Sequence, residues 1–376
     1  MADRDLSPIH GWDHDRGRTH ISLNCLYTSK FRTRDRADLQ TRAESNETSL
    51  KALEWGAFRR PGASDPLPKK SAGCAICESD DGLPVAVGED FEYHTSPDTF
   101  LAMACQKCGL VYLNPQPTLE ALDRIYPPDY HAYQFSAEQF GLVYYMRRRL
   151  EAQRLLSYCG SLGPEARILD LGCGDGFHLR LLRTFGKPGW RLEGVDASER
   201  AVEAGGRQGT EIHQGFLEHL DLPPASYDLA LLIAVIEHVP NPVAVLEATW
   251  RLLKPGGTIV IVTDNTRSLD FALFGGRHWG GYHFPRHLYL FSPASMRALA
   301  AKTGFEVTGL ETIVSPVNWV YSIRNGLVDY HAPRWLIDRF SLRSVSSLAV
   351  FTFLDTLLQW TGRGALLKVA LRKPAA

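Results

Sequence analysis

The chain has 376 residues, of which 44% are hydrophobic and 10% aromatic, and its 41 Lys and Arg nearly balance its 42 Asp and Glu. This composition excludes collagen-like, coiled-coil and wholly disordered chains, and the length allows two domains or one enlarged core. The net charge of −1 excludes a global field that would draw the chain to nucleic acid or to an anionic membrane. No secretory signal opens the chain, and the apolar stretch Leu348–Trp360 is too short for a membrane-spanning helix. We therefore expect a cytoplasmic protein, with peripheral contact at the inner membrane face as the closest approach to lipid.

The first 160 residues divide into three parts. Residues 1–70 are dense in charge and poor in apolar periodicity, which predicts a poorly ordered extension with one short helix at Leu50–Phe58. Residues 71–114 carry two cysteine pairs among short strand-like runs. Residues 115–160 form a helical linker, with a helix predicted at Phe140–Cys159. Its predicted apolar face consists of Leu142, Tyr145, Met146, Leu150 and Leu155.

The cysteine pairs have the spacing of a metal site. Cys74 and Cys77 form one C-x-x-C pair, and Cys105 and Cys108 form the other. Four thiolates at this spacing predict a closed, structural Zn²⁺ site in a zinc-ribbon-like module, with a redox dithiol or an iron site as alternatives. The 27 residues between the pairs include acidic residues and neither Lys nor Arg, which is a poor surface for the phosphates of a nucleic acid.

From residue 161 onward, short β-rich runs alternate with helical patterns. This alternation predicts an α/β domain, doubly wound and Rossmann-like, with a mostly parallel seven-stranded sheet. Residues 264–291 and 312–364 are predicted cap insertions, and the second one is irregular apart from one helix. The apolar side chains of that helix, among them Leu348, Phe351, Leu354 and Leu358, are expected either to pack on the core or to lie on a membrane surface. The predicted strands are Arg167–Leu171, Arg191–Asp196, Glu211–Gln214, Tyr227–Ile236, Thr258–Thr263, Phe305–Glu311 and an antiparallel Ala365–Leu371. The predicted helices are Gly176–Phe185, Glu199–Gly205, Pro242–Leu253 and Pro293–Lys302.

A glycine-rich turn follows the first of these strands. Residues 170–176 read Asp-Leu-Gly-Cys-Gly-Asp-Gly, so that the backbone at Gly172 and Gly174 can approach a ligand without interference from a Cβ atom. The second strand ends in Asp196, whose carboxylate can accept hydrogen bonds from a ribose diol. Since Asp170 and Asp175 crowd the turn with negative charge, the turn favours a cationic ligand over a pyrophosphate.

Residues 167–305 resemble a class I S-adenosylmethionine-dependent methyltransferase. The features that carry the resemblance are the glycine-rich string at residues 170–176 and Asp196. The resemblance implies that Asp170, Gly172 and Gly174 border the methionine part of the cofactor and that Asp196 holds the ribose hydroxyls. It also implies a cofactor contact after the third and fourth strands. The residues at those positions are Phe216, Leu217 and Ala234.

The fourth strand ends in Glu237 and His238, within the string Glu-His-Val-Pro-Asn-Pro. This string resembles the turn of methyltransferases that act on oxygen or carbon of small molecules and lipid-linked intermediates, including ubiquinone-biosynthesis O-methyltransferases. It differs from the N-P-P-Y or N-P-P-F turn of enzymes that methylate planar nitrogens. His283 and His287 lie in an aromatic-rich loop on the ligand side of the sheet, so His238, His283 and His287 are the candidate general bases. The alternatives are histidines that order the loop, or a metal site, which would lack a nearby carboxylate.

The sequence thus predicts a methyltransferase acting on oxygen or carbon of a small or lipid-linked acceptor in glycan, lipid or secondary-metabolite biosynthesis. The module and core together resemble bacterial deoxysugar C-methyltransferases in layout and short motifs. An RNA methyltransferase guided by the zinc module and a non-catalytic cofactor-binding subunit remain as alternatives.

Overall fold

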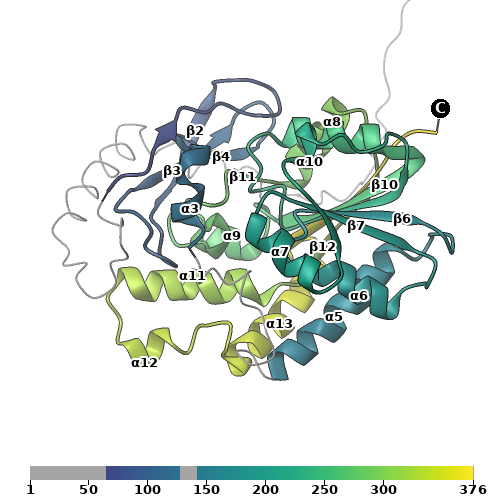
Figure 1. Cartoon of the computed structure of the whole chain (residues 1–376). Helices are drawn as coiled ribbons and strands as arrows, with labels where there is room; N and C mark the ends of the chain where they lie inside the picture. Colours follow the sequence, from purple (N-terminus) through teal and green to yellow (C-terminus); the bar gives the residue numbers. More distant parts are fainter. Residues whose placement is uncertain (1–64, 128–141, 376) are drawn as a thin grey trace, which may run out of the picture.

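The computed structural model of the chain describes residues 65–127 and 142–375 (Figure 1). The helix predicted at Leu50–Phe58, and all but the last six residues of the predicted charged extension, lie outside the described residues. Figure 1 shows a smaller group of strands at the upper left, a larger α/β unit at the right, and a layer of helices along the lower edge.

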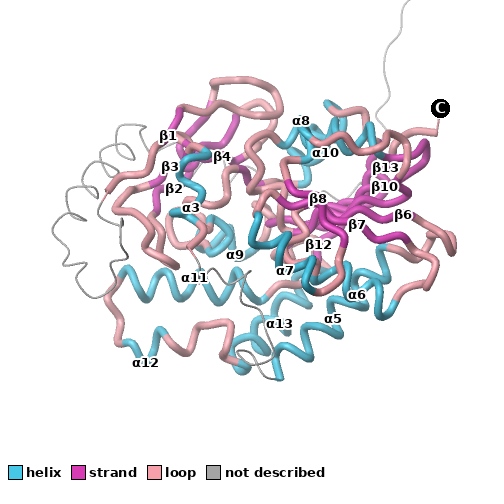
Figure 2. Tube along the Cα trace, in the orientation of Figure 1, coloured by secondary structure: helices cyan, strands magenta, loops and turns pink. Residues whose placement is uncertain are grey.

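A seven-stranded sheet forms the centre of the larger unit (Figure 2). Its strands in chain order are β6 (Arg167–Leu171), β7 (Arg191–Asp196), β8 (Glu211–Gln214), β9 (Tyr227–Ile233), β10 (Leu253–Asp264), β12 (Glu306–Ile313) and β13 (Leu366–Arg372). The spatial order is β12-β13-β10-β9-β6-β7-β8. Strands β8, β7, β6, β9 and β10 pair in parallel, and β13 is antiparallel to both β10 and β12. The predicted mostly parallel seven-stranded sheet is confirmed.

Helices cover both faces of this sheet. In Figure 1, α8 and α10 lie above the sheet, and α5 and α6 lie below it. The helices are α5 (Leu142–Tyr158), α6 (Phe177–Phe185), α7 (Glu199–Arg207), α8 (Pro242–Leu252) and α10 (Pro293–Lys302). Side chains of Ser198, Asn241 and Ser292 accept hydrogen bonds from the first-turn N–H groups of α7, α8 and α10, which explains where these helices begin.

The two faces of the sheet follow from the alternation of side chains along each strand. On β6, Ile168 packs in a cluster with Leu155 of α5 and Leu182 of α6. Its neighbour Leu169 packs in a different cluster, with Leu246 of α8 and Leu299 of α10. Because both faces are covered, the strands are apolar on both sides, as parallel sheets usually are.

The apolar face predicted for α5 is corrected by the structure. Tyr145, Met146 and Leu150 are exposed, whereas Ala152 and Leu155 are buried against the sheet and α6. The prediction weighted large side chains and overlooked the small Ala152, which lets the helix approach the sheet closely.

The smaller unit contains the cysteine pairs and borrows a strand from the larger one. Its strands are β1 (Lys69–Lys70), β2 (Gly82–Gly88), β3 (Phe100–Cys105), β4 (Val111–Leu113) and β5 (Gln116–Pro117), followed by the short helices η2 (Leu119–Ala121) and α3 (Leu122–Ile125). Strands β1 and β5 pair with each other. The other strands of the smaller unit lie in a separate four-stranded sheet with the order β11-β4-β3-β2. Its strand β11 (Tyr289–Leu290) comes from the end of the 264–291 insertion. The module and the insertion therefore form one sheet.

They also share one core and a buried ion pair. Phe100 of β3 stacks on Phe284 of the insertion, with ring centroids 6.0 Å apart. The guanidinium of Arg286 bonds both carboxylate oxygens of Asp90 at 3.1 and 2.9 Å, and both side chains are fully buried. The Arg286 Nε atom also donates to the carbonyl of Ile125 in α3. These contacts fix the insertion, and with it His283 and His287, to the module.

Both cap insertions contain helices. The first contains α9 (Leu269–Phe274) and η5 (Gly280–Tyr282). A further short helix, η4 (Leu217–His219), lies outside the insertions and follows β8. The second contains α11 (Pro316–Asp329), α12 (Arg334–Ile337) and α13 (Val345–Gln359), which form the lower layer in Figure 2. The prediction of one helix in an otherwise irregular segment was wrong, because the polar residues of α11 that interrupt its apolar pattern are themselves buried in hydrogen bonds.

The predicted apolar face of α13 packs on the molecule. Phe351 stacks on Trp319 of α11 with ring centroids 5.7 Å apart, and Leu348, Leu354 and Leu358 are partly buried. Asp355, fully buried, accepts hydrogen bonds from the backbone N–H groups of Ser315 and Ala365. Of the two expected positions for this face, the structure shows the one in which it packs on the core.

Within residues 65–127 and 142–375, none of the helices combines the length and the hydropathy needed to cross a bilayer.

Candidate active site

The glycine-rich turn lies between β6 and α6, as the sequence predicts. Gly172, Gly174 and Gly176 have φ values of +65°, +55° and +79°, a region that side chains rarely adopt. A Cβ atom on Gly172 would lie 2.7 Å from the side chain of Val235 in the turn after β9. A Cβ atom on Gly174 would meet nothing within 4 Å. The turn is therefore packed on one side and open at Gly174 on the other.

Asp196, at the end of β7, holds this turn. One carboxylate oxygen accepts a hydrogen bond from the Gly174 N–H at 2.8 Å, and the other accepts from the Ser198 N–H at 2.8 Å. Burial and the negative charge of Asp170 raise the pKa of Asp196, against the effect of these two donors. Each oxygen keeps a lone pair with which it can accept a ligand hydroxyl.

Asp170 presents a buried acceptor to the same turn. Its Oδ2 atom is buried without a hydrogen bond and lies 3.5 Å from Nδ1 of His178. An ammonium group of a ligand would supply the missing donor. The Asp170 carboxylate and the open face at Gly174 thus fit the amino acid part of S-adenosylmethionine, and Asp196 fits its ribose.

The remaining predicted cofactor residues follow β8 and β9. Phe216 lines a pocket of about 60 Å³ together with His238, Tyr126 and Arg286. Leu217 is buried in the core, so that its backbone is what it can offer to a ligand. Ala234 has a φ of +54°, and its N–H donates to the carbonyl of Val262 at 2.8 Å, which fixes the turn at the end of β9.

The three candidate histidines come together, although they are up to 49 residues apart in the chain. The ring centroids of His238 and His287 are 4.5 Å apart, and those of His283 and His287 are 5.1 Å apart. His238 also belongs to the turn that packs on Gly172, since its N–H donates to the carbonyl of Val235. The glycine turn and the histidines therefore meet at the carboxyl edge of the sheet, where parallel α/β sheets bind ligands.

Hydrogen bonds assign the protons on two of the rings. Nδ1 of His238 lies 3.1 Å from the carbonyl oxygen of Arg286, and Nδ1 of His287 lies 2.7 Å from that of Gly281. Because a carbonyl only accepts, each Nδ1 carries a proton, and in the neutral ring the lone pair is on Nε2. The hydroxyl of Tyr126 lies 3.0 Å from the same Nδ1 of His238. Nδ1 of His283 is 2.6 Å from the carboxylate of Glu92.

The two rings differ in charge preference. Burial, followed by the charges of His287 and His283, lowers the pKa of His238 well below 6.5. Burial also disfavours the charged form of His287, but the hydrogen bond to Asp264 at 3.2 Å and the charges of Asp264 and Glu237 outweigh it and raise the pKa of His287. The surroundings thus favour the neutral form of His238 and the charged form of His287.

The expectation that no carboxylate lies near the histidines was wrong. Ligand atoms of Glu237, His238 and His287 all lie within 4.8 Å of one another. Burial raises the pKa of Glu237 to about 7. Its Oε2 atom accepts from the Thr263 hydroxyl at 2.8 Å, and its carbonyl accepts from the Leu288 N–H at 2.7 Å. Glu237 therefore joins β9 to the loop that carries His287.

Sequence reasoning missed a further polar contact to His287. Asn318 of α11 donates from Nδ2 to Oδ1 of Asp264 at 2.6 Å, and Asp264 in turn bonds His287. These three residues are separated by 23 to 54 positions, and nothing in the local sequence around Asn318 indicates the contact. Tyr126 and Glu92 were missed for the same reason, because both come from the smaller unit, far from the histidines in the sequence.

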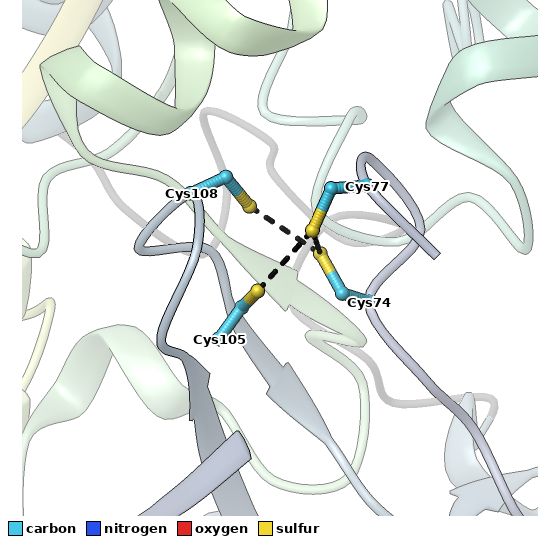
Figure 3. A group of neighbouring side chains, drawn as sticks. All are labelled: Cys74, Cys77, Cys105 and Cys108. Carbon is cyan, nitrogen blue, oxygen red and sulfur yellow. Dashed lines mark hydrogen bonds between the residues drawn. The ribbon is translucent and has the colours of Figure 1, made fainter. Parts of the chain in front are cut away.

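The four module cysteines converge (Figure 3). Sγ–Sγ distances are 3.4 Å for Cys74 and Cys108, 3.6 Å for Cys74 and Cys77, and 3.4 Å for Cys77 and Cys105. Burial opposes the thiolate of Cys105, but backbone N–H donors of Cys108 and Lys107 lower its pKa to about 7. Four sulfurs at these distances fit around a tetrahedral ion with Zn–S bonds of about 2.3 Å.

Known proteins resemble this chain over part of its length. The sequence pattern described as methyltransferase domain matches residues 143–310. The chain is 31% identical over 186 residues to the ubiquinone biosynthesis O-methyltransferase of Bordetella bronchiseptica, which covers 46% of this chain and 75% of the relative. It is 33% identical over 153 residues to the enzyme of the same name from Maricaulis maris, covering 38% and 59% of the two chains. Among solved structures, a possible histamine N-methyltransferase from Thermotoga maritima has a TM-score of 0.41 at 22% identity, with 63% and 94% of the two chains covered.

The match to the methyltransferase pattern contains the glycine turn, Asp196 and His238, and the Bordetella relative is covered over three quarters of its length. The chain belongs to the methyltransferase domain family.

Proposed function

We propose that this protein is an S-adenosylmethionine-dependent methyltransferase that transfers a methyl group to oxygen or carbon of a small or lipid-linked acceptor. The observation that carries the proposal is the meeting of the glycine turn with the histidine cluster through Val235 and His238. A cofactor site and a group able to take up a proton are thereby adjacent. The ubiquinone biosynthesis relatives support an oxygen acceptor.

The residues of the turn fit the cofactor by charge and by hydrogen bonding. Asp170 would accept from the cofactor ammonium, and Asp196 would accept from the ribose hydroxyls. Phe216 would lie beside the adenine, because it follows β8 and lines the pocket that contains His238. When bound, S-adenosylmethionine supplies a methyl group on a positively charged sulfur, an electrophile that needs no metal assistance.

Among the three histidines, His238 is our first choice as general base. It lines the same pocket as Phe216, and its lowered pKa keeps it neutral at the pH of the cell. Its Nε2 would take the proton of the acceptor hydroxyl while the methyl group passes from the sulfur to the acceptor oxygen, which would leave a neutral thioether as the second product. His287, held by Asp264, is a positioning residue next to it. His283 is tied to Glu92 and supports the loop.

The cysteine module has a structural part in this proposal. A Zn²⁺ ion held by Cys74, Cys77, Cys105 and Cys108 would have no open position for substrate, so it would stabilise the module and not take part in the reaction. Because β4 of the module pairs with β11, the ion would indirectly hold the loop with His287.

The resemblance to deoxysugar C-methyltransferases leads us to propose an acceptor from glycan, lipid or secondary-metabolite biosynthesis. RNA is a weaker candidate. The acidic spacer of the module includes Glu89, Asp90 and Glu92, and these bond Arg277, Arg286 and His283 within the protein. That spacer offers no basic path for a phosphate backbone.

Metabolite profiling of a strain that lacks the gene tests the proposal. We expect a small metabolite or glycolipid that is lighter by one methyl group to accumulate, and the wild-type gene to restore the methylated form. Restoration by a His238→Gln gene should fail, because loss of general-base help lowers kcat by roughly 10². The purified variant should bind S-adenosylmethionine with wild-type affinity in calorimetry.

A His331→Asn gene is the matched control, because His331 lies in the exposed turn between α11 and α12. It should restore methylation fully. An unchanged metabolite pool together with a missing RNA methyl group would overturn the small-acceptor assignment in favour of RNA. Full activity of His238→Gln would return this histidine to a structural role and leave His287 as the next candidate.

A further inference from the structure

We infer that the outward face of α12 and α13 is a docking surface for an anionic lipid bilayer. The inference goes beyond the proposed reaction and does not depend on it. It begins with the distribution of exposed apolar side chains. On α13, Val350, Phe353 and Trp360 are 62%, 70% and 76% exposed, and Trp335 of α12 is 66% exposed.

These side chains form one continuous face of α13. Val350, Phe353, Leu357 and Trp360 follow one another at spacings of three and four residues, which places them on the same side of a helix. The opposite side is occupied, since Phe351 stacks on Trp319 and Asp355 bonds the backbone of Ser315. A helix on the surface of a globular protein normally carries charged residues outward. Residues Val345–Gln359 include one charged residue, Asp355, and it is buried.

Positive charge flanks this face along the chain. Arg334, Arg339, Arg343 and Arg363 are all exposed, and Asp338 is the one exposed acidic residue between positions 330 and 363. Aromatic side chains bordered by arginine are the composition of helices that lie in the headgroup region of a membrane. The arginines complement the negative headgroups of an anionic lipid. Because no helix of the described residues can cross a bilayer, the contact is with the surface of the membrane.

A second copy of the chain fits this face less well. A symmetric dimer places the same patch on both subunits, so the arginine border of one copy would meet that of the other. Such like charges repel each other, whereas a bilayer that contains acidic lipid attracts them all.

The position of the face relative to the active site is consistent with a lipid-surface substrate. The helix α11 packs against α13, and its Asn318 bonds Asp264 beside His287. One helix thus connects the docking face with the histidine cluster.

Vesicle flotation with the purified full chain tests the inference. The probes are vesicles of phosphatidylcholine alone and of phosphatidylcholine mixed with phosphatidylglycerol. We expect the wild type to float with the anionic vesicles and to bind them less at high salt. A Phe353→Ser/Trp360→Ser variant should bind roughly tenfold more weakly or worse, since two large apolar side chains no longer enter the interface. An Arg339→Gln/Arg343→Gln variant should lose a similar factor, and only for the anionic vesicles.

The matched control is Leu119→Ser/Leu273→Ser, which removes two comparably exposed apolar side chains from η2 and α9. Its binding should equal that of the wild type. Circular dichroism and thermal melting show whether each variant is folded, as expected for substitutions of exposed residues. Failure of the wild type to float with anionic vesicles would overturn the inference. So would a wild-type dimer in light scattering that Phe353→Ser/Trp360→Ser dissociates, because the second copy would then be the partner.

Discussion

At the end of β7, the carboxylate of Asp196 holds the backbone of Gly174 and is the proposed acceptor for the ribose hydroxyls. We expect Asp196→Ala to weaken the binding of S-adenosylmethionine by roughly 1.5 to 3 kcal/mol, because charge-assisted hydrogen bonds are lost. Isothermal calorimetry on the purified variant measures this change. Asp196→Asn, which keeps one oxygen acceptor, should fall between the wild type and the alanine variant.

Glu199→Ala provides the comparison, because it removes a carboxylate three residues away in the exposed first turn of α7. Its affinity should stay at the wild-type value. A folded Asp196→Ala protein with unchanged affinity would rule out the ribose assignment.

Single residues were predictable where a motif is local. The glycine turn, Asp196 and the three histidines could be identified because each lies in a short string whose chemistry is unusual for its place in the fold. Asn318, Tyr126 and Glu92 could not be identified in this way. Each reaches the histidines from a separate segment, and only tertiary packing brings their side chains into contact.

At the level of elements, the cysteine module offers the next test. We expect about one Zn²⁺ per chain in protein purified without chelator, since four thiolates satisfy the ion completely. The Cys105→Ser/Cys108→Ser variant should lose the ion and the fold of the module, because zinc binding and folding are coupled in such sites. Elemental analysis measures the metal, and amide hydrogen exchange of β2, β3 and β4 measures the fold.

Cys159→Ser is the control for the loss of a buried thiol, because Cys159 packs with Leu155 and Ile168 away from the cluster. It should retain the zinc. Wild-type protein without zinc would contradict the assignment, and iron in its place would identify the alternative ion.

The elements of the α/β core were predicted more accurately than those of the insertions. The central strands β9 and β10 contain continuous apolar runs and overlap their predicted ranges, because both faces of the sheet are covered there. The helix α11 was missed since Asn318, Ser322 and Asn325 interrupt its apolar pattern, and all three are buried. Their polar atoms bond Asp264, the Gly280 N–H and the His278 carbonyl, partners that no local pattern shows.

At the level of the whole molecule, the buried Asp90–Arg286 pair holds the two units together. Burial disfavours the Asp90 carboxylate, but the charge and hydrogen bonds of Arg286, with further donors from Thr95 and Tyr93, lower its pKa well below the usual range. We expect Asp90→Asn to lower the free energy of unfolding by roughly 3 to 5 kcal/mol at neutral pH, because Arg286 stays buried without its counter-charge. Chemical denaturation measures the change.

The sign of the pH dependence follows from the lowered pKa. The stabilisation from Asp90 is present above about pH 4, the usual aspartate pKa in an unfolded chain, and is lost as the pH falls towards the folded value. The difference between wild type and Asp90→Asn should therefore shrink in acid. Glu311→Gln, which breaks the exposed pair with Lys368, should change stability by about 1 kcal/mol or less. A similar small effect of Asp90→Asn would show that the pair does not connect the units.

The shared sheet also has a consequence for synthesis on the ribosome. Strand β4 ends at Leu113, but its partner β11 begins at Tyr289 and Arg286 lies 196 positions after Asp90. At ~5 to 20 residues per second, the nascent module waits roughly 10 to 40 s for its fourth strand and its counter-charge. During that interval β4 is an unpaired edge and Asp90 has no guanidinium, and an unpaired edge of this kind can pair with other extended chains. Synthesis of the 264–291 insertion is thus also the last step in completing the sheet of the cysteine module.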